Sequence, residues 1–415
     1  MTTTSVAATQ TAAIRWASFY GDRDEALRFP AAWDVTVHEH AGGDDIGEAG
    51  IAAAFDNPIG SAPIRELAAG KGSAVVVVDD LTRPTPAARL LPRILRELHA
   101  AGLTPADILI LAGVANHRVL TRDDFIKKVG EEVVNTYRTR SHFSWANCDP
   151  VGTTSRGTPV SLNSEFLAAE CRILVGSIMP HNKTGFSGGS KLVLPGVAHI
   201  DTAHAWHGPD GPRTGLIETA SESRLDSEEV ARLAGVDCIV NVIPNAWRGI
   251  AGLVVGDLVE AHRAGVAIAR RVYATLVPSG VDVCVLASYP KDAEYQQTGR
   301  GFHPLLTAPE PIVRPGGTIV LAGSTVEGPG FHSLYGPGMP MYGAGAGRAM
   351  PGAPDMVYFM PGMAKLGLPP GPRERVALMT DWADVQRWLS DKHGDRASVA
   401  VFPCATLQIA AGAGG

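Results

Sequence analysis

The chain has 415 residues, of which 45% are hydrophobic and 19% charged, and its formal net charge is −6 at pH 7. This composition is typical of a soluble globular protein with a large core, and it excludes extensive disorder. The acidic balance also argues against a nucleic-acid-binding surface, which needs a basic face, and favours a small-molecule ligand.

The N-terminal residues 1–13 are small and polar and lack the basic start and apolar run of a secretion signal, so they predict a disordered tail. The longest apolar stretches, such as 74–78, fall far short of the roughly 20 residues that span a bilayer. The five cysteines are odd in number and scattered, as reduced thiols usually are. Together these features predict a cytoplasmic protein with no membrane partner.

From residue 74 onward, buried strands and helices alternate. Strands are predicted at the apolar runs 74–78, 107–113, 171–180 and 237–244. Because these runs lack polar alternation, they are typical of a parallel sheet that is covered on both faces. Helices are predicted within 85–104, where Pro92 is expected to kink the helix or shift its start, and over 257–276.

A new strand begins after residue 278, and the length suggests two domains, so we predict an N-terminal domain over 1–277 and a C-terminal domain over 278–415. The second part contains a strand near 316–324, a glycine-, methionine- and proline-rich stretch over 328–354, a helix near 381–394 and a final apolar segment. Compact domains rarely carry long idle loops, so the glycine-rich stretch is expected to lie near a site.

Reactive side chains follow three of the predicted strands directly. Asp80, Thr82 and Arg83 come after the first strand. His117 follows the second strand, and His181 follows the third. Ligands of doubly wound sheets bind at the carboxyl ends of the strands, so we expect these residues to lie close together. Arg83 suits a carboxylate or a phosphate, and Asp80 is expected to hold it in place.

The segment 185–191, GFSGGSK, combines glycines and small hydroxyls with a lysine that comes ten residues after His181. Its backbone N–H groups are unhindered by side chains, as a phosphate cradle requires, but its spacing is not that of a Walker loop. An NTPase is therefore disfavoured. Lys191 precedes an apolar run that removes its stem from water, so it is predicted to lose its proton and become a nucleophile.

Three histidines follow within nine residues, at His199, His204 and His207. Neutral imidazole is the commonest metal-binding side chain, so this group indicates a metal, most often zinc. The alternative is a solvated helix start with Asp201 or Thr202 as its cap.

Taken together, the motifs resemble those of a known family, the nickel-dependent lactate racemases (LarA and its relatives). The resemblance is carried by DDLTRPTP, GVANHR, HNKTGFSGGSKLVLPG, the histidine at 207 and GDLVEAHRAGV, which cover most of residues 57–275 in family order and spacing. It implies an α/β fold of two domains, each with a mainly parallel sheet flanked by helices, and an active site in the interdomain cleft. It also implies a racemase or epimerase that inverts C2 of a 2-hydroxy acid by hydride transfer.

The cofactor that this resemblance implies is a nickel pincer nucleotide, a pyridinium-3-thioamide-5-thiocarboxylate mononucleotide carrying nickel. Lys191 resembles the lysine that joins the cofactor covalently, and His207 the protein's nickel ligand. His117 and His181 resemble the two acid/base histidines, and Arg83 the arginine beside the reacting oxygen of the substrate. Further cofactor contacts are expected from Asp80, Thr82, Ser187, Gly188 and Gly189. Dedicated maturation enzymes make this cofactor in the family and are implied as partners.

The second domain departs from the family pattern. Tyr295 and Gln296 resemble a substrate-binding tyrosine and glutamine. The carboxylate-binding lysine of the family corresponds to Gly299 by direct count, or to Arg300 if one residue is inserted. Because the stretch 328–354 also differs from the lactate enzymes, we expect a hydroxy acid that is bulkier or more apolar than lactate.

Two other functions remain open at the level of the sequence. One is a zinc-dependent hydrolase that uses His199, His204 and His207 with Asp201 as ligands and His181 as base. The other is a non-catalytic protein that binds a carboxylate or nucleotide through Arg83 and the glycine loop.

Overall fold

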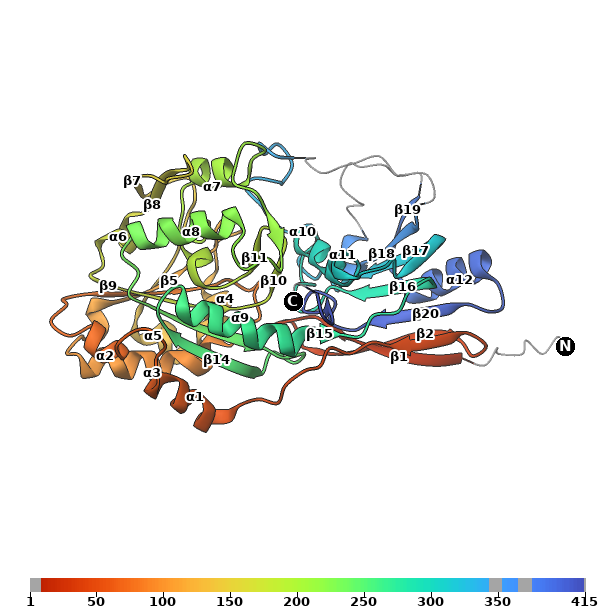
Figure 1. The fold of residues 1–415 in the computed structure, drawn as a ribbon, viewed down its shortest axis with the longest axis horizontal. Helices are drawn as coiled ribbons and strands as arrows, with labels where there is room; N and C mark the ends of the chain where they lie inside the picture. The colour runs from red at the N-terminus through yellow and green to blue at the C-terminus, as the bar shows by residue number, and fades with distance from the viewer. Residues whose placement is uncertain (1–8, 343–352, 365–374, 414–415) are drawn as a thin grey trace.

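A computed structural model describes residues 9–342, 353–364 and 375–413, and most of these residues are arranged around two six-stranded sheets (Figure 1). In the first sheet all neighbouring strands run parallel except β13 and β14, which are antiparallel. Its strands, in spatial order, are β14 (Ile250–Gly256), β13 (Cys238–Pro244), β9 (Cys171–Ser177), β4 (Ala74–Val78), β5 (Ile108–Ala112) and β6 (Arg138–Ser141).

All neighbouring strands of the second sheet are parallel. In spatial order they are β19 (Val376–Met379), β18 (Asp355–Phe359), β17 (Val313–Ala322), β16 (Val281–Ala287), β20 (Ser398–Phe402) and β3 (Asp34–Val37). This α/β architecture of parallel sheets flanked by helices confirms the fold class that the sequence predicted.

Smaller sheets and helices surround these two. The smaller sheets are formed by β1 (Thr9–Trp16) with β2 (Arg23–Pro30), β7 (Cys148–Thr153) with β8 (Pro159–Asn163), β15 (Ala274–Thr275) with β21 (Ile409–Ala410), and the trio β10 (Pro180–His181), β11 (Thr184–Phe186) and β12 (Gly215–Leu216). The helices are α1 (Gly47–Asp56), α2 (Ile64–Leu67), α3 (Ala87–Ala100), α4 (Arg122–Val129), α5 (Glu131–Thr136), α6 (Ser164–Ala168), α7 (Ile200–His207), α8 (Glu222–Leu233), α9 (Glu260–Tyr273), α10 (Tyr295–Thr298), α11 (His303–Thr307) and α12 (Trp382–His393). Short 3-10 turns lie at Pro105–Asp107, Gly189–Leu192, Gly299–Phe302 and Pro361–Met363.

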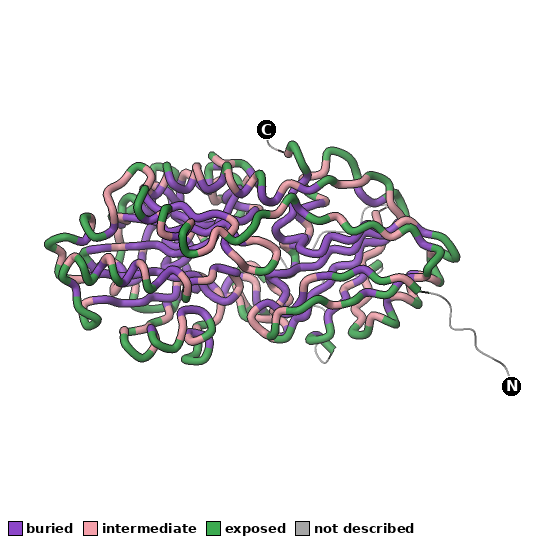
Figure 2. The backbone as a smooth tube through the Cα atoms, turned by 90° about the horizontal axis from the view of Figure 1, so that it is seen from below, coloured by how far each residue is buried: buried purple, intermediate pink, exposed green. Residues whose placement is uncertain are grey.

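The first sheet has a hydrophobic core on each face, because successive side chains of a strand point to opposite sides. Along β4, Val75 and Val77 join the core beneath α8 and α9. Val76 and Val78 join the core beneath α1, α2 and α3. Figure 2 shows the resulting run of buried backbone through the centre of each sheet. The unbroken valine run is therefore a strand of a parallel sheet that is covered on both faces, as its pattern indicated.

The N-terminal residues belong with the second sheet, which corrects two predictions. Thr9–Ala13 form part of β1 rather than a disordered tail, and residues 1–8 lie outside the described part. Ala12, Ile14 and Trp16 of β1 pack in the core of the second sheet, and β3 pairs with β20. Residues 9–37 lie within the predicted N-terminal domain. In β1 and β2, however, buried apolar side chains alternate with more exposed ones and cover a face of the second sheet. The division of the chain into two domains is otherwise a prediction that stands as made.

Two smaller expectations also meet the structure. Pro92 lies inside α3, which begins at Ala87 and continues past the proline. Of the glycine-rich stretch, residues 328–342 and 353–354 are described, and 343–352 lie outside the described residues. Within the described ranges, no helix combines the length and apolarity that crossing a bilayer requires.

Candidate functional site

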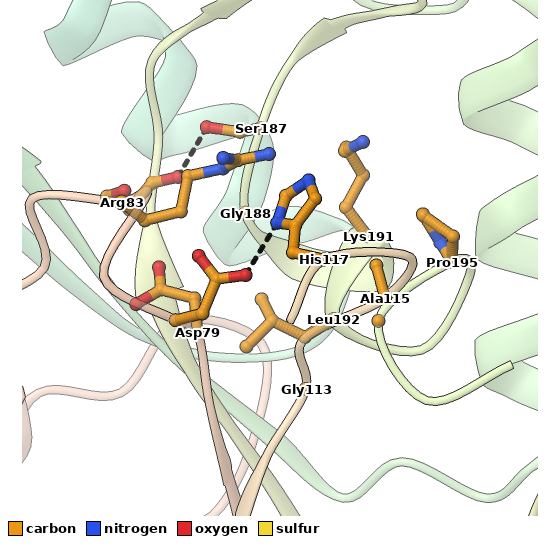
Figure 3. Close-up of a pocket in the computed structure, with 13 residues that line it drawn as sticks. Asp79, Arg83, Gly113, Ala115, His117, Ser187, Gly188, Lys191, Leu192 and Pro195 are labelled. Atoms are coloured by element: carbon orange, nitrogen blue, oxygen red, sulfur yellow. Dashed lines mark hydrogen bonds and ion pairs between the residues drawn. The ribbon is translucent and has the colours of Figure 1, made fainter. Parts of the chain in front are cut away.

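The polar residues that follow β4, β5 and β9 gather at one edge of the first sheet, because these three strands are parallel neighbours. Figure 3 shows the side chains of Arg83, His117 and Lys191 beside one another in this region. Asp80 contacts His117, and His181 contacts Lys191. The expected clustering of the strand-end residues is therefore present in the structure.

Asp80 orients His117. One carboxylate oxygen of Asp80 lies 2.6 Å from Nδ1 of His117, and the other accepts hydrogen bonds from the backbone N–H and the hydroxyl of Thr82. Arg83 donates to the Thr82 hydroxyl at 2.6 Å and forms no ion pair with Asp80, which corrects the expected Asp80–Arg83 contact. The loop therefore acts as a chain of contacts from Arg83 through Thr82 and Asp80 to the imidazole.

The ionisation of this pair follows from its contacts. Burial opposes ionisation of Asp80, but the nearby His117 and Arg83 and the hydrogen bond from Thr82 outweigh it and hold the pKa of the Asp80 carboxyl well below its usual range. Burial lowers the pKa of His117, and Asp80 offsets part of this effect. We assign an ionised Asp80 and a neutral His117 with its hydrogen on Nδ1, which makes Nε2 an acceptor on the side of the Gln297 amide.

Lys128 of α4 fixes the loop from beneath, and sequence reasoning missed it. Its ammonium is buried, lies 2.5 Å from a carboxylate oxygen of Asp79, and donates to the backbone carbonyls of Asp80 and Arg83 at 3.0 and 2.9 Å. A buried ammonium needs such partners, since an isolated charge is expensive to remove from water. The sequence shows only a lysine within an amphipathic helix, and a lysine in such a helix ordinarily indicates the solvent-exposed face.

Lys191 and His181 form the second contact of the site. Nζ of Lys191 lies 3.2 Å from Nε2 of His181 and 5.5 Å from the centre of the Trp206 ring. Burial, followed by the positive charges of Arg83 and others, holds the pKa of Lys191 well below its usual value. The predicted neutral, nucleophilic amine is what these surroundings favour.

His181 differs from His117 in how its ring is held. Its Nδ1 accepts the backbone N–H of Lys183 at 3.1 Å. Burial holds the pKa of His181 well below its usual value, so the ring is neutral, and because Nδ1 accepts, the hydrogen is on Nε2. His117 therefore presents a lone pair toward the site and His181 an N–H group.

Two backbone N–H groups of the glycine loop already have partners within the protein. The N–H of Ser187 donates to the carbonyl of Met179, and the N–H of Gly189 donates to Oδ1 of Asn241 at 2.7 Å. Gly188 has φ +76°, and a Cβ there would lie 2.7 Å from the Asn241 side chain, so tight packing requires this glycine. Ser187 and Gly188 line a small cavity together with Lys191, whereas Gly189 does not line it.

Arg224 of α8 holds the loop in place and was also missed. Its side chain is fully buried, and its guanidinium donates to the carbonyls of Thr184, Phe186, Ser187 and Gly188 and to the hydroxyl of Ser190. Burial lowers the pKa of Arg224 to about 9. The loop is therefore a rigid support that presents Lys191, rather than a flexible phosphate-binding turn.

His207 ends α7 and faces the same cavity as Lys191. Its Nδ1 donates to the carbonyl of Ala203 at 2.8 Å, so the Nε2 lone pair is free. Burial lowers the pKa of His207 to about 3. A neutral imidazole fixed in this way is the form that binds a metal.

The other two histidines of the cluster point elsewhere. His199 is the N-cap of α7 and accepts the N–H of Asp201, and His204 is exposed. Among the described residues, no three His, Cys, Asp or Glu side chains gather as a metal site. The ligand set of the zinc hydrolase alternative is thus not assembled.

The second half of the chain contributes Gln297 and Arg300. The amide of Gln297 lies 3.1 Å from Nε2 of His117, and both residues line the main cavity. The predicted Tyr295 instead packs against the ring of Tyr358, and Gln296 lies outside the cavity lining. Gln297 and Arg300 are three residues apart, which is the separation expected between the substrate-binding glutamine and the cation, so the resemblance to the family pattern is shifted by one residue from Gln296 to Gln297. Gly299, the other candidate for the position of the cation, is exposed.

The main cavity has a volume of about 310 Å³ and lies between the two halves of the chain. Arg300, which lines it, has its pKa lowered to about 10 by burial and by Arg83. Lys291 is buried nearby, and its amine has no hydrogen-bonding partner among the described residues. The cavity is lined by Arg83, Ala115, Asn116, His117, His181, Asn182, Lys183, Lys191, Pro195, His207, Thr214, Gln297, Arg300, His332 and Tyr335. Its positive surroundings suit anionic ligands.

The chain is similar to known proteins along most of its length. Residues 20–211 match the family described as the lactate racemase N-terminal domain. A lactate racemase from Lactiplantibacillus plantarum is 31% identical over 293 residues, which are 69% of this chain and 68% of that protein. The chain belongs to the lactate racemase family. It is therefore an enzyme of the isomerase class.

Other relatives agree with this assignment. A lactate racemase from Thermoanaerobacterium thermosaccharolyticum is 30% identical over 294 residues, 69% of this chain and 67% of that protein. The solved lactate racemase apoprotein from the same organism has the same fold, with a TM-score of 0.72 at 21% identity over 96% of this chain and all of that one. A Thermotoga maritima structure reaches 0.62 at 16% identity, covering 82% of this chain and 96% of that one.

Proposed function

We propose that this enzyme is a nickel-pincer-nucleotide-dependent racemase or epimerase that inverts C2 of a 2-hydroxy acid larger than lactate. The observation that carries the proposal is the meeting, around one cavity, of the buried amine of Lys191, a free imidazole nitrogen at His207 and a carboxylate-oriented imidazole at His117. Membership of the lactate racemase family supports the reaction class.

The residues present fit this cofactor. Lys191 would hold it covalently through Nζ, because a neutral amine is the reactive form of lysine. His207 would bind nickel through Nε2, whose lone pair is free because Nδ1 donates to the Ala203 carbonyl. Within the described residues no three His, Cys, Asp or Glu side chains gather as a complete ligand cluster, which suits a metal whose other ligands come from the cofactor. The chemistry that this group would supply when bound is reversible acceptance of hydride from C2.

The remaining residues act on the substrate. His117 is the base that removes the hydroxyl proton, since Asp80 holds its hydrogen on Nδ1 and directs Nε2 to the cavity. Arg83 stabilises the charge on the reacting oxygen, and Arg300 binds the carboxylate. Gln297 positions His117 and the substrate from the second half. His181 is the acid/base group for the opposite configuration.

The proposal is tested by the composition of matured enzyme. The chain is produced together with the cofactor-maturation enzymes and examined by whole-protein mass spectrometry and metal analysis. A covalent adduct on Lys191 and about one nickel per chain are expected. The Lys191→Ala variant is expected to lack the adduct, and His207→Ala is expected to lose most of the nickel.

His199→Ala and His204→Ala are the matched controls for the metal ligand, because neither histidine lines the cavity. Both variants are expected to retain nickel. An unmodified Lys191 with no nickel in matured enzyme would overturn the proposal. Tightly bound zinc that depends on His199 and His204 would favour the hydrolase instead. If His117→Ala and His181→Ala alter only ligand affinity, the protein is a binding protein.

A further inference from the structure

The segment 328–342 of the second half reaches across to the first half and covers the site. Ser333 donates its backbone N–H to the carbonyl of Asn116 at 2.8 Å, and its hydroxyl contacts the same residue. Leu334 is buried against Ile200 and Ala203 of α7. Figure 1 shows this blue segment beside α7. It is therefore anchored at both the His117 loop and the His207 helix.

His332 lies directly before this anchor and faces the cavity. Its ring meets that of His117 edge to face, with ring centres 5.3 Å apart. Nδ1 of His332 accepts the backbone N–H of Leu334 at 3.2 Å. Burial lowers the pKa of His332 to about 2, so the ring is neutral. Its hydrogen is consequently on Nε2, and His332 presents a fixed donor.

Tyr335 continues the same wall. Its ring centre lies 4.8 Å from that of His332 and 6.3 Å from that of His207. Burial raises the pKa of Tyr335, so its phenol keeps its hydrogen. Among the described residues, none accepts a hydrogen bond from Nε2 of His332 or from the Tyr335 hydroxyl. The wall beside the proposed base and the proposed metal ligand therefore has two neutral donors that a ligand can satisfy.

We infer that His332 and Tyr335 determine specificity at C3 of the substrate and select a hydroxylated substituent, so that 2,3-dihydroxy acids are preferred to acids with an alkyl group there. This inference rests on the proposed function. An alkyl substituent would exclude water from both donors without replacing its hydrogen bonds, and a site with unpaired donors rejects such analogues strongly. The donors are neutral, which favours a hydroxyl over a second carboxylate. The expectation of a more apolar substrate than lactate is not supported by this lining.

The test compares two acids of matched size. Glycerate and 2-hydroxybutanoate differ only in a hydroxyl against a methyl group, and lactate and malate complete the panel. In nickel-loaded enzyme with modified Lys191, kcat/KM is expected to be at least about tenfold higher for glycerate than for 2-hydroxybutanoate or lactate. Malate is expected to be slower than glycerate.

Two variants connect this preference to the wall. His332→Phe and Tyr335→Phe are each expected to lower kcat/KM for glycerate about tenfold and to change that for 2-hydroxybutanoate by less than about threefold, since each removes one donor but retains the ring. Phe331→Leu is the control, because Phe331 is exposed and adjacent in the chain. It is expected to leave the preference unchanged.

The outcomes separate this inference from the proposed function. Turnover of 2-hydroxybutanoate or lactate as fast as glycerate, a faster malate reaction, or an equal loss on both acids in His332→Phe and Tyr335→Phe would overturn the inference and leave the racemase assignment intact. Failure of the loaded enzyme to invert any of the four acids would also overturn the inference, whereas an unmodified Lys191 with no nickel in matured enzyme would overturn the proposed function.

Discussion

Asp80 and His117 show what residue-level reasoning predicts well. Both follow strands whose unbroken apolar runs are easy to recognise, and parallel neighbours bring the next residues to one edge of the sheet. Which side chain pairs with which depends on local turns, so the expected Asp80–Arg83 contact was wrong while the clustering was right. Gln297, His332 and Tyr335 were missed because their positions depend on how the second half packs against the first, which no local pattern encodes.

The role of Asp80 is tested by Asp80→Asn, which retains the size of the side chain but removes its charge. The amide can donate to Nδ1 of His117 and so favour the wrong tautomer, with the hydrogen on Nε2. We expect kcat to fall by about two to four orders of magnitude, on the scale seen when a buried aspartate that orients a catalytic histidine is replaced. Racemisation is followed by polarimetry. Nickel content should be unchanged, and a loss below tenfold would contradict the assigned tautomer.

At the scale of elements, the glycine loop between β9 and α7 gains its shape from α8. The sequence predicted the loop and its lysine, but a run of glycines gives no sign of the partner that holds it rigid. Arg224 lies inside a helix, where an arginine is ordinarily assigned to the surface. Its guanidinium donates to four buried carbonyls of the loop, and three of these also accept from the Thr184 hydroxyl, His262 or the backbone N–H of Lys191.

Arg224→Met is expected to lower the free energy of unfolding by about 3–5 kcal/mol, because several buried hydrogen bonds of the guanidinium to the loop are lost at once. Urea unfolding measures the change. Arg213→Met is the matched control: the Arg213 side chain is 70% exposed, so its replacement should change stability by less than about 0.5 kcal/mol. Equal effects of the two substitutions would show that Arg224 does not support the loop.

At the scale of the whole molecule, burial of neutral histidines couples stability to pH. His142 is fully buried, where it contacts the carbonyl of Ala198 and the amide of Asn163, and burial lowers its pKa to about 4. In the unfolded chain His142 binds a proton near pH 6.5, whereas in the folded chain it does so only near pH 4. The contribution of the neutral His142 to the free energy of unfolding is therefore complete above pH 6.5 and is lost as the pH falls toward 4.

His142→Gln retains a neutral donor and acceptor but cannot titrate. Between pH 7 and pH 5 the wild-type protein is expected to lose about 2 kcal/mol more unfolding free energy than this variant, because its folded state resists protonation. Urea unfolding at the two pH values measures the difference. Parallel losses in the two proteins would show that His142 is not the group responsible.

The pairing of β3 with β20 has a consequence for biosynthesis. Asp34 is the partner of Ser398, and the apolar faces of β1 and β2 are covered by strands that come after residue 280. During synthesis on the ribosome, these early strands have unpaired edges until nearly the whole polypeptide is made, whereas the strands of the first sheet can pair earlier. Nascent chains stalled before β20 should therefore be the species most dependent on chaperones, because an uncovered strand edge invites pairing with another molecule.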